Sequence, residues 1–426
     1  MNIVVLNGNP DELRHSFDRY LADLGQALRS QGHTVDELRL RDLDLRDCVG
    51  CFGCWVKTPG QCVVNDAAPV IDAAVIRSDF TLWAAPLRMG FPSALLKRAL
   101  DKSIPLVHPY FEVVNNEAHH RSRYARYPRL GLLVEREPDT DADDLELVSA
   151  IFARTALNLK SALSFAVTTE TPVLKLAGQI AGTTQTSPPI PSRPLPTLGT
   201  RVTPPRRLTV FNGSPRGRRG NTPILLDQLA KGFNRAGGNA DELWHLNRRH
   251  DAGRFIQAFA AAECVWLGFP LYTDAMPGLV KTFIEELAPL CGRSHNPPLG
   301  FLVQSGFPES AHSRHIERYL EKLAARLGSP YLGTIVKGGG EGVRLMPAQA
   351  NRKLFEQLQS LGSDLAQEGQ LSARTLRAIA TPERYPGWLA PVFKLFTRTP
   401  WASFYWDDQL KRNGVFQQRD AMPYDD

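Results

Sequence analysis

The sequence lacks the segments that would place a chain in or across a membrane. Its N-terminus has no basic stretch followed by a long apolar run, so it does not read as a secretory signal peptide. Nowhere do about 18 apolar residues follow one another, which argues against a transmembrane helix. We therefore expect a cytoplasmic protein without a transmembrane segment.

A strong excess of charge is also missing. The formal net charge of +6 favours anionic ligands but is too small to indicate a nucleic-acid partner. Hydrophobic residues make up 43% of the chain and charged residues 22%, which is ordinary for a globular protein. Because 426 residues exceed what one core usually holds, we predict two domains.

Cysteine is scarce and unevenly placed, because four of the six residues fall between Cys48 and Cys62. In a reducing cytoplasm we expect no structural disulfides. The isolated Cys264 and Cys291 are expected to behave as small buried hydrophobic residues.

Two parts of the sequence repeat one plan. Asn2–Pro10 and Arg207–Pro215 each read as a short apolar strand followed by Asn-Gly-x-Pro, and an amphipathic helical pattern follows both. Further on, Asp79–Asp101 aligns without a gap with Glu263–Glu285. The order of these landmarks is the same in both halves, which indicates an internal repeat.

A proline-rich stretch separates the halves. Thr183–Arg207 contains seven prolines and little apolar surface, which is typical of an extended, semi-rigid linker. We place a first domain at residues 1–181, the linker at 182–206, a second domain at 207–380 and an aromatic-rich tail at 381–426.

Each half alternates apolar strand runs with helical patterns, which indicates a doubly wound α/β domain with a parallel sheet. In such sheets ligands bind beyond the carboxyl ends of the strands. The residues that follow each strand are therefore the candidates for a site.

In the second half, the first such loop is Asn212–Thr222. Its glycines let the backbone approach a ligand closely, and a helix begins at about Pro223, so exposed N–H groups would favour an anion. It is neither a Walker loop, because no Gly-Lys-Ser/Thr follows, nor a G-x-G-x-x-G loop. An ordinary glycine-rich turn is the alternative.

These loops, together with GFPLYTDAMPGLVKTFIE, resemble the NADPH-dependent FMN reductase family of flavodoxin-like proteins. The resemblance implies two flavodoxin-like doubly wound domains in tandem. It also implies that FMN phosphate is held by Ser214, Arg216, Asn221 and Thr222. The ribityl chain and ring would be bordered by Pro270, Leu271, Tyr272 and Thr273, with Ser305, Gly306 and Phe307 as a third wall. For Tyr272 and Phe307, plain core packing is the alternative.

The first half departs from this pattern, since its loop Asn7–Tyr20 lacks the glycines and the Asn-Thr pair. It is similar to the quinone-reductase branch of the superfamily. The matching cofactor positions are then Asn9, Ser16 and Phe17 in the first loop and Pro86, Leu87, Arg88 and Met89 in the second.

The first half also carries an insertion that the second lacks, Arg46–Asp66. It contains the spacing Cys48-x2-Cys51-x2-Cys54-x7-Cys62. Four thiolates in a short loop suit a [4Fe–4S] cluster or tetrahedral zinc, and the tight spacing of the first three favours the cluster.

The insertion resembles the cysteine motif of the iron–sulfur flavoproteins, in which electrons would pass between cluster and FMN. It equally resembles flavodoxin-like reductases that carry these cysteines as a metal-free loop. A cluster, a metal-free loop, zinc and a redox disulfide therefore remain open.

Three further segments carry weaker signals. The basic run Asn115–Arg129 would suit nucleotide phosphates but is more typical of a solvated loop. His312 and His315 share a helical face without a third metal ligand, so we expect them at the surface. The tail after Thr381 could lie on a membrane or pack on the protein, and we favour packing.

The resemblance implies an enzyme in which NAD(P)H delivers hydride to FMN, and FMN passes electrons to a small-molecule or protein acceptor. One alternative is electron transfer through a cluster, and another is a non-catalytic flavin-binding protein. No catalytic side chain is assigned. Related domains commonly dimerise near the flavin, so an intramolecular pseudo-dimer or a homodimer is expected.

Overall fold

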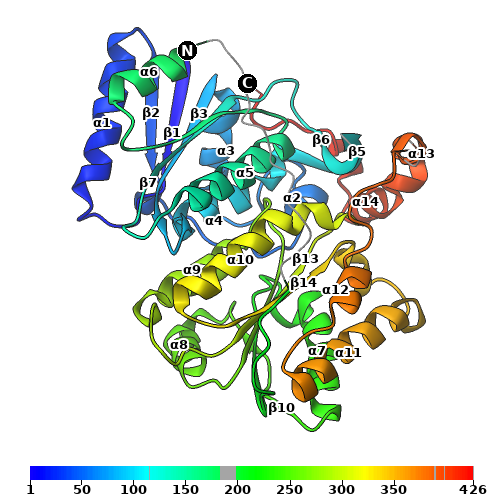
Figure 1. The fold of residues 1–426 in the computed structure, drawn as a ribbon. Helices are drawn as coiled ribbons and strands as arrows, with labels where there is room; N and C mark the ends of the chain where they lie inside the picture. Colours follow the sequence, from blue (N-terminus) through cyan, green and yellow to red (C-terminus); the bar gives the residue numbers. More distant parts are fainter. Residues whose placement is uncertain (115, 183–197, 388–389, 398, 426) are drawn as a thin grey trace. The chain divides into compact units, whose positions relative to one another are not determined.

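The computed structural model describes the chain except for residues 115, 183–197, 388–389, 398 and 426. The chain divides into two compact units, each with its own parallel sheet (Figure 1). Unit 1 comprises Met1–Pro191 and Gly387–Asp426, and unit 2 comprises Ser192–Pro386.

The strands of unit 1 pair in the order β2-β1-β3-β7-β8, all in parallel. This is the 2-1-3-4-5 order of flavodoxin-like sheets. The strands are β1 (Asn2–Asn7), β2 (Thr34–Arg39), β3 (Phe80–Arg88), β7 (Arg129–Glu135) and β8 (Leu163–Thr168). The main helices are α1 (His15–Ser30), α3 (Ala68–Arg77), α4 (Ala94–Lys102), α5 (Ala142–Asn158) and α6 (Val173–Ala181).

Unit 2 repeats this order with β9 at the second position, since its strands run β10-β9-β12-β13-β14. The strands are β9 (Arg207–Asn212), β10 (Asn239–Ala240), β11 (Trp244–His245), β12 (Val265–Pro270), β13 (Leu299–Gln304) and β14 (Tyr331–Lys337). The helices are α7 (Thr222–Arg235), α8 (Ala252–Ala260), α9 (Gly278–Glu286), α10 (Arg314–Leu327), α11 (Arg352–Glu368) and α12 (Ala373–Ile379). The predicted fold class, two doubly wound parallel-sheet domains of flavodoxin-like order, is confirmed.

The shared Asn-Gly-x-Pro motif has a packing reason in both units. Gly8 donates its N–H to Ala84 in unit 1, and Gly213 donates to Gly268 in unit 2, each at 2.7 Å. A Cβ at Gly8 would lie 2.6 Å from the Cβ of Leu96, and one at Gly213 would collide with Val280. Glycine is therefore needed where the first strand ends.

A buried ion pair also recurs. Lys97 of α4 pairs with Asp101, and Lys281 of α9 pairs with Glu285 at 2.6 Å. Both lysine side chains are fully buried, and the carboxylate one helical turn later stabilises each charge.

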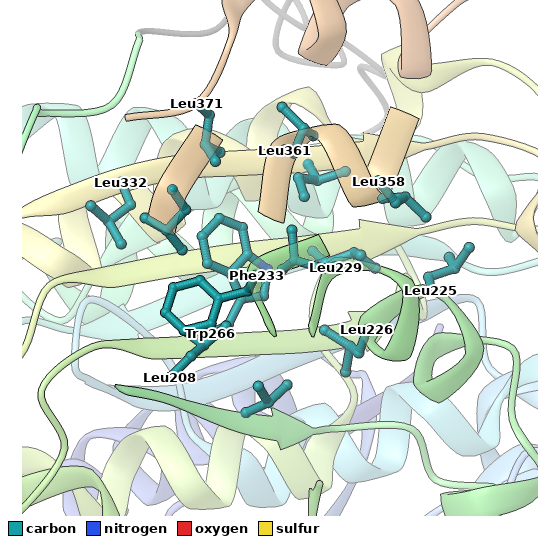
Figure 2. Packing of buried hydrophobic residues seen from close by; sticks show 14 of the residues in the cluster. Leu208, Leu225, Leu226, Leu229, Phe233, Trp266, Leu332, Leu358, Leu361 and Leu371 are labelled. Atoms are coloured by element: carbon teal, nitrogen blue, oxygen red, sulfur yellow. The ribbon is translucent and has the colours of Figure 1, made fainter. Parts of the chain in front are cut away.

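Helices α7 and α11 pack with their backbones in contact in the core of unit 2. A Cβ at Gly232 of α7 would collide with the carbonyl oxygen of Gln359, and one at Gly362 of α11 would collide with that of Leu229. Figure 2 shows leucines of α11 meeting Leu229 and Phe233 of α7 in this cluster.

Part of the predicted linker belongs to unit 2, while residues 183–197 of it lie outside the described residues. Thr200 donates to the carbonyl of Tyr331 in β14, and Val202 donates to that of Gly369. Residues 198–206 therefore lie along unit 2 as extended chain.

The expectation of a solvated basic loop was wrong for most of Asn115–Arg129. Strand β6 (Glu117–Ser122) forms a hairpin with β5 (Val107–Val114). His119 is 1% exposed and Arg123 is 4% exposed, because later parts of the chain cover the hairpin. Residue 115 itself lies outside the described residues.

The expectation that His312 and His315 lie at the surface was also wrong, because both side chains are buried. Backbone bonds from Ser310 to Pro382 and from Ala311 to Glu383 hold a distant segment over this turn. Helical periodicity alone cannot reveal such a cover.

The tail forms α13 (Ala390–Phe396) and α14 (Pro400–Arg412) and belongs to unit 1. Trp406 is 8% exposed and packs on unit 1, as we favoured, whereas Trp401 is 80% exposed. Of the helices that the described residues form, none is long and apolar enough to cross a membrane.

Candidate functional site

The β9–α7 loop of unit 2 (212–222) is organised by the side chain of Asn212, which is fully buried. Its amide nitrogen donates to the carbonyl of Gly217 at 3.2 Å, and its oxygen accepts the backbone N–H of Ser214 at 3.1 Å. Gly217 has φ +55°, a left-handed conformation that favours glycine. The loop is thus curled into a cradle at the start of α7.

The surroundings of this loop are cationic. The amide of Asn212 lies 2.8 Å from the Nδ1 of His245. Burial, followed by the charges of Arg218 and Arg248, lowers the pKa of His245, so this ring is neutral at neutral pH. The positive charges near this loop are therefore those of Arg218 and Arg248 and not that of His245, and they favour an anionic occupant.

An anion from the chain itself occupies the predicted phosphate ligands. Arg216 donates to Oε1 of Glu341 at 2.7 Å, and the amide of Asn221 lies 3.2 Å from Oε2. The Oγ1 of Thr222 is buried and has no hydrogen-bond partner among the described residues. Ser214 is buried against Gly220, whose added Cβ would collide with the Ser214 hydroxyl.

These donors fit a phosphoryl group in kind. A guanidinium, an amide, an unsatisfied hydroxyl and the start of a helix without a side-chain cap all favour an oxyanion. Their present occupant is a carboxylate, so a phosphate would have to replace Glu341.

The predicted ring-binding loops follow the next two strands at the same sheet edge. In the loop after β12, Leu271 donates to Gln304 at 2.7 Å, Tyr272 pairs with Ala275, and Thr273 has φ +42°. Pro270 ends β12 and is buried, whereas Leu271, Tyr272 and Thr273 are partly exposed. Tyr272 is therefore not a core residue.

After β13, the hydroxyl of Ser305 donates to the carbonyl of Phe307 at 3.0 Å. A Cβ at Gly306 would meet nothing within 4 Å, so this turn leaves open space. The Oε1 of Gln304 is buried without a hydrogen-bond partner among the described residues. The three loops of unit 2 thus follow neighbouring strands, as the sequence predicted.

The corresponding first loop of unit 1 is built around a carboxylate. Asp18 accepts hydrogen bonds from Asn7 at 2.9 Å, Asn9 at 3.2 Å and Arg41 at 2.8 Å. Burial raises the pKa of Asp18, but the bonds from Arg41, Asn7 and Asn9 outweigh it and lower the pKa overall. The negative charge of Asp18 would repel a phosphate that entered this loop.

The remaining predicted ligands of unit 1 are dispersed. Phe17 is fully buried in the core, whereas Ser16 is exposed and its hydroxyl lies 3.4 Å from Glu135. Asn9 is buried within the Asp18 network. These three residues do not form one cradle.

The second loop of unit 1 also holds a carboxylate of the chain. The backbone N–H groups of Met89 and Gly90 donate to the two oxygens of Glu137, each at 2.9 Å. Pro86, Leu87 and Met89 are buried, and Arg88 lies 4.0 Å from Asp11. Glu137 therefore occupies the donors that this loop presents.

The cysteine loop (48–62) curls through left-handed residues, with φ +66° at Gly50 and +57° at Phe52. Trp55 anchors it by donating to the carbonyls of Ile104 and Val107 at 3.2 and 2.9 Å. All six cysteines of the chain are free thiols; Cys264 is buried as expected, but Cys291 is exposed, which corrects that expectation.

The four thiols of this loop share one neighbourhood. Burial, and then the charges of the other three thiols Cys48, Cys62 and Cys51, raise the pKa of Cys54 well above its ordinary value. Burial, and then Asp101, raises the pKa of Cys48 to about 12. Thiols whose pKa is raised in this way are protonated at neutral pH unless a cation binds them.

A buried cation lies beside the loop. The ammonium of Lys102 is 3.3 Å from the sulfur of Cys62 and 2.7 Å from Asp66. Within the described ranges, no three His, Cys, Asp or Glu side chains are grouped so that they could hold a metal ion. The donors suit a cluster in kind, but the ligand set is not assembled.

The C-terminal segment (400–425) covers the cysteine loop. Trp406 packs edge-on against Trp55 with ring centroids 5.2 Å apart, and Asp407 accepts a 2.7 Å bond from Tyr110. Pro423 lies so close to Gly60 that an added Cβ would be 2.7 Å away. Burial, and then Asp72, raises the pKa of Tyr424.

Residues 1–117 match the family of NADPH-dependent FMN reductases. An iron–sulfur flavoprotein of Archaeoglobus fulgidus is 22% identical over 103 residues, which cover 24% of this chain and 49% of that protein. One of Methanocaldococcus jannaschii is 31% identical over 80 residues, which cover 19% and 40%. The chain thus spans about half or less of the length of these curated relatives.

Among solved structures, an FMN-dependent NADH-azoreductase from Bacillus anthracis is similar with a TM-score of 0.31 and 11% identity. The similarity covers 38% of this chain and 99% of that one. The family match supports the resemblance to FMN reductases for the first part of unit 1.

Sequence reasoning missed the carboxylates at these sites, Glu341 and Glu137. Each follows a parallel strand, β14 and β7, so the rule that ligands bind beyond strand ends was the available signal. It also missed Lys102 and the covering role of the C-terminal segment.

Proposed function

We propose that this chain is an FMN-dependent NAD(P)H oxidoreductase that passes electrons to a small-molecule or protein acceptor. The observation that carries the proposal is the β9–α7 loop. There Arg216 and Asn221 bind the carboxylate of Glu341, and the buried Thr222 hydroxyl has no partner among the described residues. The family match of residues 1–117 supports the reaction class.

In this proposal Ser214, Arg216, Asn221 and Thr222 hold the FMN phosphate. The loops 270–273 and 305–307 border the ring and exclude water from it. FMN, when bound, supplies the hydride and electron chemistry, while the chain binds and orients it. We assign the first flavin site to unit 2 because its first loop keeps a buried hydroxyl without a partner among the described residues, that of Thr222, whereas the corresponding loop of unit 1 is built around the carboxylate of Asp18.

The test is binding and reduction of FMN. The purified chain should retain added FMN through gel filtration, and NAD(P)H should bleach the bound flavin under anaerobic conditions. Thr222→Val should weaken FMN binding about tenfold, because a hydrogen bond to a charged group contributes roughly 1.5 kcal/mol at the lower end of its range. Binding of riboflavin, which has no phosphate, should not change.

Ser329→Ala is the matched control. It also removes a buried hydroxyl without a partner among the described residues, but Ser329 precedes β14 at the opposite sheet edge. A chain that binds no FMN, or that loses FMN equally in both variants, would contradict the proposal.

A second candidate function, electron transfer through a [4Fe–4S] cluster, is favoured by Lys102, whose ammonium lies 3.3 Å from the sulfur of Cys62 in the loop that carries the four cysteines. Lys102 would offset part of the negative charge of four thiolates. Anaerobic reconstitution with iron and sulfide should load the chain, and Cys51→Ser should abolish loading. The exposed Cys291 gives the control Cys291→Ser; equal iron in both variants would reject this candidate.

A further inference from the structure

The segment that carries Glu341 crosses the candidate site of unit 2. We call residues 338–346 the Glu341 strap. It begins after β14 with three glycines, and the N–H groups of Gly339 and Gly340 donate to Phe307 at 2.7 Å and to Ser305 at 2.8 Å. The strap therefore starts on the loop proposed to border the flavin ring.

The strap then reaches the β9–α7 loop. Glu341 contributes one carboxylate oxygen to Arg216 at 2.7 Å and the other to Asn221 at 3.2 Å. The backbone oxygen of Glu341 also accepts a bond from the Asn221 amide at 3.2 Å. Its carboxylate thus binds a cation and an amide as a phosphate oxygen would.

Beyond Glu341 the strap is tied down a second time. The guanidinium of Arg344 donates to the carbonyls of Arg218 at 3.3 Å and Gly220 at 3.0 Å. The backbone N–H of Arg344 donates to the side-chain oxygen of Asn221 at 3.1 Å. Val343 is buried, and its carbonyl accepts a bond from Asn351 at 2.8 Å. The contact is therefore a docked arrangement with several bonds.

The anchorage at the loop remains incomplete. The Thr222 hydroxyl, fully buried at the start of α7, receives no hydrogen bond from any described residue. A carboxylate has two oxygens, whereas a phosphate monoester has three outside the ester bond. Because Thr222 directly follows Asn221, we expect the third oxygen of a phosphate bound to Arg216 and Asn221 to accept a bond from this hydroxyl.

An internal anion competes with a free one at high effective concentration, because a short tether holds it at the millimolar level. The Glu341 side chain is 30% exposed and that of Arg216 is 21% exposed, so the pair is open to exchange with solutes. Gly338 and Gly340 let the strap lie directly on the loop after β13, since an added Cβ would collide with the carbonyl oxygen of Pro308 at the first and with the Oε1 of Gln304 at the second. Where these contacts are released, the glycines leave the backbone free to rotate.

We propose that Glu341 is an autoinhibitory anion: the strap closes the β9–α7 loop, and a phosphate monoester binds only by displacing Glu341. The identity of that ester as FMN rests on the proposed function, but the competition itself does not. The strap thereby makes flavin occupancy of unit 2 depend on phosphate and on strap opening.

The experiment measures dissociation constants for FMN and riboflavin by quenching of flavin fluorescence, in the full chain and in Glu341→Gln. We expect Glu341→Gln to bind FMN about tenfold more tightly, because the ion pair that competes for Arg216 is removed. Riboflavin affinity should stay the same. Glu356→Gln, which removes an exposed carboxylate on α11, is the matched control and should change neither value.

A gain for riboflavin equal to that for FMN, or no gain for FMN, would overturn the proposal. If Glu341→Gln does not fold, Arg344→Ala provides the test, since it loosens the strap and should give a smaller gain for FMN only. An Arg344→Ala chain with unchanged FMN affinity would then overturn it.

Inorganic phosphate separates this inference from the proposed function. If no flavin binds to any variant, the FMN assignment fails. Phosphate should still raise the melting temperature of Glu341→Gln more than that of the unchanged chain. Equal shifts in both would overturn the autoinhibitory role of Glu341 itself.

Discussion

The two units share a sheet order and differ at the edge where ligands bind. Both place glycine after the first strand and a buried lysine pair in the helix after the third. In unit 1, fixed carboxylates hold the donors of the first two loops, and the insertion adds four thiols. In unit 2, a carboxylate on a glycine-rich strap holds donors of the first loop, Arg216 and Asn221. The fold is thus constant, and the charges placed on its edge set what each copy can bind.

The largest expected change in the free energy of unfolding concerns the buried lysine–carboxylate pairs that both units share. Asp101→Asn leaves Lys97 buried without its carboxylate and should destabilise unit 1 by about 4 kcal/mol. Glu285→Gln should cost unit 2 less, because the Glu285 side chain is 17% exposed and that of Asp101 is 2% exposed. Urea unfolding of the full chain measures both, and equal costs would show that exposure does not distinguish the pairs.

In unit 1, the C-terminal segment (400–425) covers the cysteine loop. Trp406→Ala removes a side chain packed on Trp55 and Phe52 and should cost about 3 kcal/mol of docking, as for a core tryptophan. Labelling of Cys54 by iodoacetamide should then become faster in mass spectrometry. Trp401→Ala, at an 80% exposed position, is the control; equal labelling in both would mean that the segment does not shield the thiols.

In unit 2, helices α7 and α11 pack with their backbones in contact. Gly232→Ala would press a methyl group onto the carbonyl of Gln359 and should destabilise unit 2 by about 2 kcal/mol. Gly253→Ala in α8, where a Cβ meets nothing within 4 Å, should be neutral or slightly stabilising. Thermal unfolding compares them. Similar melting temperatures would contradict the close backbone contact.

The smallest expected effect is a pH dependence of opposite sign in the two units. In unit 2, burial raises the pKa of Glu317 to about 7, despite the opposing Arg314 and with the help of Glu383 and Glu321. The folded state then holds a proton that the unfolded state releases above its pKa of 4.5. Stability from this group is therefore complete below pH 4.5 and is lost as pH rises from about 4.5 to 7.

In unit 1, burial and then Lys160 lower the pKa of His120 to about 3, and burial and then Arg123 lower that of His108 to about 4. Their contribution is complete above pH 6.5 and is lost as pH falls toward these values. Glu317→Gln and His120→Phe should each remove their own slope from the pH dependence of unfolding. Slopes of the same sign would refute this contrast.

The fold was predictable because strand runs buried on both faces and an ungapped repeat determine it. The loops after β9, β12 and β13 were also placed correctly along one edge. The carboxylates at these loops were not predictable from local pattern, because Glu137 and Glu341 lie far in sequence from the donors that they bind. The same holds for His312, covered by residues 382–383, and for Arg123, which bonds the carbonyls of Arg419 and Ala421.

We propose that flavin phosphate binds at the β9–α7 loop of unit 2 and not at the matching loop of unit 1. Calorimetric titration with FMN of the full chain, Thr222→Val and Ser16→Ala tests it most directly. We predict one FMN per chain, with affinity lowered about tenfold by Thr222→Val and unchanged by Ser16→Ala. Loss of affinity in Ser16→Ala with none in Thr222→Val would contradict the account.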